Sequence, residues 1–427
     1  MTTLKAVRGT RDLLPPETAL WNRIESTARA VFARYNFGEI RTPIFEDTGL
    51  FARGVGEETD IVSKEMYTWD DRARAQSEKT QSLTLRPENT AGVVRAYIEH
   101  QLGETGQLQQ LYYIGPQFRR ERPQKGRYRQ FSQIGAEVIG PPSAGSESPI
   151  RDAEILEMLA TLLDELGITG WTLHLNSVGS QADRARYNET LRAALVPVVD
   201  QMCVDCQRRA VTNPLRVLDC KIPADQPIID TLPVIADSLD EASRTHFAQV
   251  LAALDAAGVP YTRNHRLVRG LDYYTRTTFE FTHGGLGAQN ALLGGGRYDG
   301  LSEMLGGPRA PGIGFAMGED RLVLTLQALE TAQIQEKAAA FIAPLGEGIN
   351  PAALALAREL RHAGLRIELG EGSFRLKKSF EAADKTARAI VILGEDELKS
   401  GILTVKTFST GIQTKVPRAE LVDFLTK

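Results

Sequence analysis

The spacing of hydrophobic residues changes several times along the chain, and each change marks a different element. From Asp152 to Leu166 apolar residues recur every three or four positions, the spacing of one face of a helix. Residues 20–37 and 88–102 also favour helices. The sequence therefore predicts helices at these three places.

In residues 128–138 the period changes to two, which is typical of a strand. Gln133 and Glu137 fall on one face of this strand. The opposite face carries aliphatic residues, namely Ile134, Ala136 and Val138. The polar face is either exposed to solvent or forms the floor of a cleft.

The coarser pattern predicts the domain organisation. Residues of about 178–258 are mostly helical in pattern and interrupt two strand-rich regions, so we interpret them as an insertion. After about residue 330, short strands alternate with helices, which is typical of a small α/β domain. We therefore predict a first domain over residues 1–330 and a second over residues 331–427.

Composition supports a globular protein of more than one domain. The chain has 427 residues, which exceeds the usual length of one domain. It contains no apolar run of the ~18–20 residues that a membrane span needs, and its start lacks the apolar run of a secretory signal. We expect a cytoplasmic protein without membrane contact. The net charge of −4 means that any RNA contact depends on local basic patches.

Three cysteines, Cys203, Cys206 and Cys220, have the spacing Cys-x2-Cys-x13-Cys. An odd and small number argues against a disulfide scaffold. The spacing is similar to part of a zinc site, but a structural zinc needs four ligands and no fourth is evident nearby in the sequence. We favour reduced structural thiols over zinc, and predict no metal site.

The densest chemical signal lies between Arg119 and Arg129, where six of eleven residues are basic. Pro123 and Gly126 interrupt the run, and strand patterns flank it. This predicts a hairpin with a cationic loop, which suits phosphates because arginine presents a planar fork of donors. The alternative is a solvated basic turn.

A glycine run at residues 294–296 has two interpretations. It is not a phosphate-binding loop of the Walker type, because no Lys-Ser or Lys-Thr follows at the required spacing. It is either a tight turn between strands or a place where the backbone lets a ligand approach closely.

Several of these segments resemble the class II aminoacyl-tRNA synthetases. Phe118-Arg-Arg-Glu121 resembles their second signature motif, residues 311–321 their third, and Ile40 to Pro43 their first, which builds a dimer interface. Two further segments, residues 269–275 and 291–301, are similar to signatures of the histidyl-tRNA synthetases. The resemblance covers essentially the whole chain.

This resemblance implies a fold and an activity. The expected fold is an α+β catalytic domain with an antiparallel sheet, a helical insertion at about 178–258, and a C-terminal α/β domain of the anticodon-binding type. The expected activity is ATP-dependent, AMP-forming ligation of L-histidine to tRNA(His) by a homodimer, with Mg²⁺ on the ATP phosphates.

The resemblance also implies site residues. Arg119 and Arg269 would be catalytic. ATP would be bound by Arg119, Glu121, Arg127 and Arg321. Histidine would be bound by Glu88, Thr90, Arg119, Gln133, Glu137, Arg269, Tyr273, Tyr274 and Tyr298, with Tyr298 lining the pocket. Gln124 and Lys125 would contact tRNA.

Two alternatives remain. One is a catalytically inactive paralogue that regulates ATP phosphoribosyltransferase in histidine biosynthesis. The chain keeps Arg269, the basic loop and a terminal domain, which such paralogues typically lose. The other is a sister synthetase for threonine, proline or glycine, against which the paired histidine signatures argue.

Overall fold

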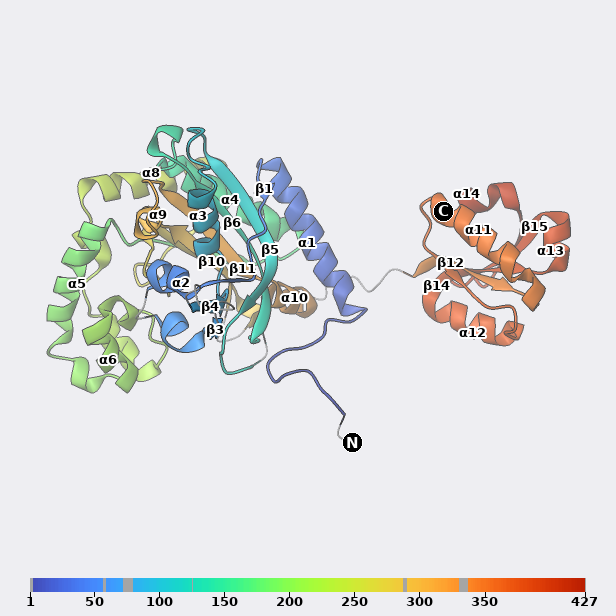
Figure 1. Ribbon diagram of the computed structural model, residues 1–427, viewed down its shortest axis with the longest axis horizontal. Coiled ribbons are helices and arrows are strands. Elements are labelled where there is room, and N and C mark those ends of the chain that lie inside the picture. The colour runs from blue at the N-terminus through green and yellow to red at the C-terminus, as the bar shows by residue number, and fades with distance from the viewer. Residues whose placement is uncertain are drawn as a thin grey trace. The chain divides into compact units, whose positions relative to one another are not determined.

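The computed structural model describes residues 3–56, 59–71, 80–124, 126–286, 290–329 and 337–426. The chain forms two compact units, Met1–Ala332 and Gln333–Lys427 (Figure 1). The predicted boundary at residue 330 lies outside the described residues. Each unit has its own core and is described by itself.

The first unit is built on an eight-stranded sheet in the order β1-β5-β6-β11-β10-β9-β7-β8. All neighbours pair antiparallel except β1 with β5 and β7 with β8, which are parallel. The strands are β1 (Gly38–Glu39), β5 (Gln109–Phe118), β6 (Gln130–Ile139), β7 (Trp171–Ser177), β8 (Thr262–Arg263), β9 (Thr275–His283), β10 (Ala291–Arg297) and β11 (Gly312–Gly318). The predicted antiparallel α+β fold is confirmed.

One face of this sheet is covered by a layer of helices that share a large apolar core with it. The helices are α1 (Glu17–Arg34), α4 (Pro149–Glu165), α8 (Glu241–Ala257) and α10 (Glu319–Ala328). Ile134, Ala136 and Val138 of β6 lie in this core, so the period-two prediction is confirmed. Because strand side chains alternate, Gln133 and Glu137 belong to the opposite face of the sheet.

Shorter elements pack on the other side. They are α2 (Thr48–Val55), the π-helix η1 (Ile61–Glu65), α3 (Thr90–Glu99), α9 (Leu301–Met304) and a small sheet of β2 (Phe45–Asp47), β4 (Gln81–Leu85) and β3 (Tyr67–Asp71). Arg86 ties this region to β5. Its guanidinium donates to the carbonyl oxygens of Pro116, at 2.9 Å, and of Thr42, at 3.0 Å. The start of α3 is thereby fixed beside the sheet.

The predicted insertion is helical, but the structure divides it. The green helices of Figure 1, α5 (Gln181–Leu195) and α6 (Val204–Thr212), belong to a separate small core together with α7 (Gln226–Ile229). Short 3-10 turns connect them, at η3 (Val199–Gln201), η4 (Pro214–Val217), η5 (Pro223–Asp225) and η6 (Ile235–Ser238). The helix α8, at the end of the predicted insertion, instead packs on α4 in the main core.

The second unit contains a five-stranded sheet in the order β13-β12-β14-β15-β16. Its strands are β12 (Ala338–Pro344), β13 (Ile367–Leu369), β14 (Ala387–Leu393), β15 (Ile402–Thr407) and β16 (Gln413–Pro417). Its helices are α11 (Asn350–His362), α12 (Leu376–Thr386), α13 (Glu395–Ser400) and α14 (Leu421–Thr426). β12 pairs parallel with both β13 and β14, so the predicted α/β architecture is confirmed.

Candidate active site

A cleft of about 320 Å³ opens on the sheet face that the helix layer leaves free. It is lined by residues of β6, β9, β10, β11 and α10 and of the loops beside them. Most of the residues predicted for the site meet there. They are Glu88, Thr90, Arg119, Glu121, Arg127, Gln133, Arg269, Tyr273, Tyr274 and Arg321.

One end of the cleft is formed by the start of α3. The Glu88 carboxylate accepts hydrogen bonds from the backbone N–H groups of Thr90, at 2.8 Å, and Ala91, at 3.0 Å. Carboxylates are favoured at a helix N-terminus because the first N–H groups have no partner in the helix. Burial raises the pKa of Glu88, and these hydrogen bonds oppose the rise. Oxygen lone pairs of Glu88 remain available to a ligand.

Glu137 lies directly beneath Thr90. The Thr90 hydroxyl donates to Glu137 Oε1 at 2.7 Å, and the Tyr298 hydroxyl donates to Oε2 at 2.7 Å. Burial raises the pKa of the Glu137 carboxyl to about 8, although both hydrogen bonds oppose the shift. A Cβ atom at Gly314 on the neighbouring strand would lie 1.6 Å from Glu137 Oε2, so only glycine leaves room for this side chain.

Tyr298 departs from its predicted place. It is buried beneath the cleft and does not line it, because its hydroxyl is directed to Glu137. The wall itself is formed by Tyr273 and Tyr274, whose ring centroids are 4.7 Å apart. Gln133 Oε1 is buried beside them without a hydrogen-bond partner among the described residues.

Arginines also line the cleft, and Arg119 lies next to the start of α3. The Nε of Arg119 donates to the Pro87 carbonyl at 2.9 Å, while its guanidinium lies over the Phe131 ring. Arg127 pairs with Glu121 at 3.1 Å, and Arg321 donates to the Ala291 carbonyl at 2.7 Å. Burial lowers the pKa of Arg321, and the positive charge of Arg127 lowers it further. Such a concentration of cations favours binding of a polyanion.

Arg269 enters the cleft opposite the glycine run. Its guanidinium pairs with Glu280 of β9 at 2.6 Å, and its Nε is buried without a partner among the described residues. A Cβ at Gly294 would lie 2.5 Å from this guanidinium. The glycines are inside strand β10, so the tight-turn interpretation is wrong. Because Gly294 has no side chain, the Arg269 guanidinium can lie close to the backbone of β10.

Sequence reasoning missed Glu280 and Phe131. Glu280 was identifiable as the one acidic residue of strand β9, whose other side chains are mostly threonine, phenylalanine and histidine. Phe131 gave no signal beyond being aromatic. Gln124 is exposed and lies outside the cleft lining, in the hairpin loop where its backbone pairs with Arg127. Lys125 lies outside the described residues.

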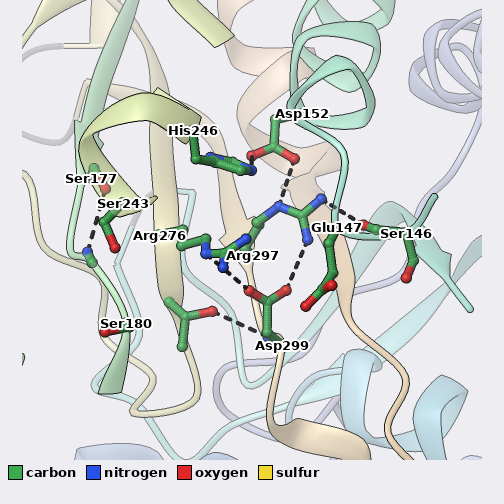
Figure 2. A network of polar contacts seen from close by, with 12 residues as sticks. Ser146, Glu147, Asp152, Ser177, Ser180, Ser243, His246, Arg276, Arg297 and Asp299 are labelled. Atoms are coloured by element: carbon green, nitrogen blue, oxygen red, sulfur yellow. Dashed lines mark hydrogen bonds and ion pairs between the residues drawn. The ribbon is translucent and has the colours of Figure 1, made fainter. Parts of the chain in front are cut away.

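Arg297, which belongs to the second histidine-type signature, lies in a different environment. Figure 2 shows Arg297 enclosed between Asp152, Asp299 and the main chain of Ser146. Its nitrogens donate to Asp152 Oδ1 at 2.7 Å, Asp299 Oδ1 at 2.8 Å and the Ser146 carbonyl at 2.6 Å. Arg297 therefore joins α4 to the end of β10 and does not face the cleft.

Comparison with known proteins covers both units. A family model described as histidyl-tRNA synthetase matches residues 9–322, and one described as anticodon binding domain matches residues 339–427. A histidine–tRNA ligase of Koribacter versatilis is 71% identical over 99% of this chain and 96% of that protein. One of Solibacter usitatus is 56% identical over 98% of both chains.

A solved structure agrees with these relatives. The apo histidyl-tRNA synthetase of Staphylococcus aureus is 38% identical, with a TM-score of 0.80 over all of both chains. Identity of this extent to histidine–tRNA ligases over the full length argues against the regulatory paralogue and against a sister synthetase. The chain belongs to the histidyl-tRNA synthetase family.

Proposed function

We propose that this cleft performs both steps of histidine–tRNA ligation, the activity of the family, with histidine at its polar end and ATP at its arginine end. The observation that carries this proposal is the meeting of two unlike environments in one cleft. The buried acceptors Glu88 and Gln133 and the cations Arg119, Arg127 and Arg321 line the same cleft. A substrate carboxylate and a phosphate would meet between them.

Histidine selection follows from the polar end. Glu88, Thr90 and Gln133 bind the ammonium group, while Glu137 and Tyr274 bind the imidazole and Tyr273 forms the wall. The hydrogen bond from Thr90 to the buried Glu137 carboxyl supports this assignment, because it joins Glu137 to a residue of the cleft lining. A ligand unable to pair with these groups leaves them desolvated and unpaired, a strong basis for discrimination.

In the first step, a carboxylate oxygen of histidine attacks the α-phosphorus of ATP, and the bond to pyrophosphate breaks. Two anions approach each other, so fixed cations must stabilise the charge that develops. Arg119 and Arg269 flank the reacting atoms, while Arg321 and Arg127 bind the outer phosphates and Glu121 contacts the adenine. Glu280 holds the Arg269 guanidinium in place through their ion pair.

In the second step, a ribose hydroxyl of tRNA attacks the activated carbonyl and AMP leaves. The hairpin loop is suited to the tRNA because Gln124 is exposed beside a run of arginines. We assign Gln124 and Lys125 to tRNA contact, with phosphate contacts giving position and base contacts giving selectivity.

Mg²⁺ would bind chiefly through phosphate oxygens. Such sites usually add only one or two carboxylates, and Glu280 lines the cleft beside Arg269. Glu280 would hold the ion, which would neutralise charge on the outer phosphates.

We also propose that the enzyme is a cytoplasmic homodimer. Exposed apolar side chains gather next to the segment similar to the first class II motif, at Ile44, Phe45 and Trp69. The rings of Phe45 and Trp69 are 6.1 Å apart between centroids. Among the described residues, no helix is long and apolar enough to cross a membrane. Sedimentation at micromolar concentration tests the dimer, and a fully active monomer would refute it.

ATP–pyrophosphate exchange with each proteinogenic amino acid tests the proposed function. The expected result is exchange driven by histidine alone. Exchange driven equally by threonine, proline or glycine, or histidine binding without any exchange, would overturn the proposal.

A further inference from the structure

The three cysteines converge on a buried carboxylate in the core of the insertion. Cys203 precedes the first residue of α6, Cys206 lies in its first turn, Cys220 follows η4, and Asp225 ends η5. Their sulfur and carboxylate oxygen atoms all lie within 4.8 Å of one another. Among the described residues this is the one cluster of three or more such groups with the geometry of a metal site.

The spacing within the cluster matches tetrahedral coordination. Zinc–sulfur bonds of about 2.3 Å place two thiolates of a tetrahedral site about 3.8 Å apart. The sulfurs of Cys203 and Cys220 are 3.9 Å apart. Asp225 Oδ2 lies 3.2 Å from the Cys220 sulfur, so the carboxylate occupies the same small space as the thiols. All three cysteines are free, and each can contribute a thiolate.

The surrounding backbone orients the ligands. The Cys203 N–H donates to Asp225 Oδ1 at 3.0 Å, and the Ile222 N–H donates to the Cys220 sulfur at 3.4 Å. Hydrogen bonds from outside the ligand set commonly fix thiolates and carboxylates in metal sites. Cys203 and Cys206, separated by two residues at a helix start, have the spacing of one half of a structural zinc site.

The location of the cluster suggests that a metal would stabilise this part of the insertion. Between α6 and α8 the chain contains only 3-10 turns and the four-residue helix α7. A small core of this kind commonly needs a crosslink or a metal. Cys220 also lines a second cavity of about 600 Å³, which Arg269 and Glu280 line as well. The segment that holds Cys220 is therefore a wall of the space beside the reaction cleft.

We propose that Cys203, Cys206, Cys220 and Asp225 form a structural zinc site that fixes the wall segment from Arg216 to Asp225 beside the cleft. Binding of Zn²⁺ replaces the three thiol protons, which are released to solvent, and involves no change of oxidation state. Four protein ligands close the coordination sphere, so the metal has no open position for substrate. This role is separate from the chemistry at Arg269 and does not depend on it.

Metal analysis of the full-length chain tests the proposal. After expression with added zinc and exhaustive dialysis, elemental analysis should find stoichiometric zinc. Replacement by Co²⁺ should give the intense visible bands of a tetrahedral site and a thiolate charge-transfer band in the near ultraviolet. Cys220→Ser should lose the zinc. The matched control is Asp205→Asn, which removes an exposed acid between Cys203 and Cys206 and should keep it.

A second measurement uses the unmodified chain, in case Cys220→Ser fails to fold. Alkylation of the three cysteines should be slow in the zinc-loaded protein and should accelerate several-fold after chelation. Metal-free protein with equal alkylation rates before and after chelation would overturn the proposal. A Cys203–Cys220 disulfide in protein purified under reducing conditions, or equal zinc loss from Asp205→Asn, would also overturn it.

Discussion

Two arginines from the two histidine-type signatures have opposite environments. Arg297 has no exposed side-chain surface and donates to two carboxylates and a carbonyl. Arg269 keeps 23% of its side chain exposed, pairs with Glu280 alone among carboxylates within 4 Å in the described residues, and leaves its Nε without a partner there. The hydrogen-bond donors of Arg297 are paired within the protein, whereas Arg269 has a donor left for a ligand. This difference in unmet hydrogen-bonding capacity, more than membership of a signature motif, supports the proposal that Arg269 takes part in the reaction and Arg297 is architectural.

The largest expected effect is on stability. Arg297→Ala leaves the buried Asp152 and the half-buried Asp299 without their main partner, and breaking a buried ion pair costs about 3–5 kcal/mol. Urea unfolding should show this loss. The control is Arg309→Ala, which removes an exposed arginine paired with Glu147 and should change the unfolding free energy by at most ~1 kcal/mol. Equal losses in the two variants would contradict the structural role of Arg297.

The next effect is on chemistry. Arg269→Ala should slow histidine-dependent pyrophosphate exchange at least ~100-fold, the scale for removing one preorganised charge stabiliser. Histidine affinity should fall much less. Arg266→Ala is the control, because Arg266 pairs with Asp230 and does not line the reaction cleft. Near-normal exchange by Arg269→Ala would refute its assignment.

A smaller effect concerns pH. Burial raises the pKa of Glu137 from its ordinary value of 4.5 to about 8, so the folded state binds this proton more tightly. Its contribution to the unfolding free energy is therefore fully present below pH 4.5 and is lost as pH rises to about 8. Glu137→Gln should flatten this fall, measured by urea unfolding across the range.

A matched variant separates the titration from ligand binding. Glu319 is also buried, with a pKa of about 8. Neither carboxyl lines the cleft, but Glu137 accepts a hydrogen bond from the cleft residue Thr90. Glu319→Gln should flatten the pH dependence and keep histidine affinity, whereas Glu137→Gln should weaken histidine binding ~10-fold, within the usual cost of an unpaired buried group. Unchanged histidine binding in Glu137→Gln would remove Glu137 from the imidazole site.

The smallest effect separates the two reaction steps. Gln124→Ala should leave pyrophosphate exchange intact and slow tRNA charging several-fold, because Gln124 is exposed in the loop and does not line the cleft. The exposed Gln107 provides a control, and Gln107→Ala should change neither rate. If Gln124→Ala reduced exchange and charging by the same factor, the loop would belong to the activation site.

The periodicity of apolar residues predicted those features of the fold that depend only on which side chains are buried. The alternation in 128–138 reports which side chains enter the core, and the structure places Ile134 and Glu137 on opposite faces of β6. The helical period likewise located α4 within a few residues. The last helix of the insertion could not be placed in this way, because its period does not say which core it joins.

The site features that the sequence did not predict depend on contacts between segments far apart in the chain. Gly294 is needed because Arg269 crosses it, which only the pairing of β10 with β9 reveals. Glu280 became a partner of Arg269 through the same pairing. Asp225 lies in a short 3-10 turn without any periodic signal, so the fourth group beside the cysteines could not be found from spacing.

The comparison of the two arginines is tested most directly by single-turnover formation of histidyl-adenylate in Arg269→Ala and Arg297→Ala, with each rate set against the unfolding free energy of the same protein. The account predicts that Arg269→Ala loses at least ~100-fold in rate with little loss of stability, and that folded Arg297→Ala keeps most of its rate with a large loss of stability. If both variants lost rate in proportion to stability, the distinction between a reacting and an architectural arginine would be contradicted.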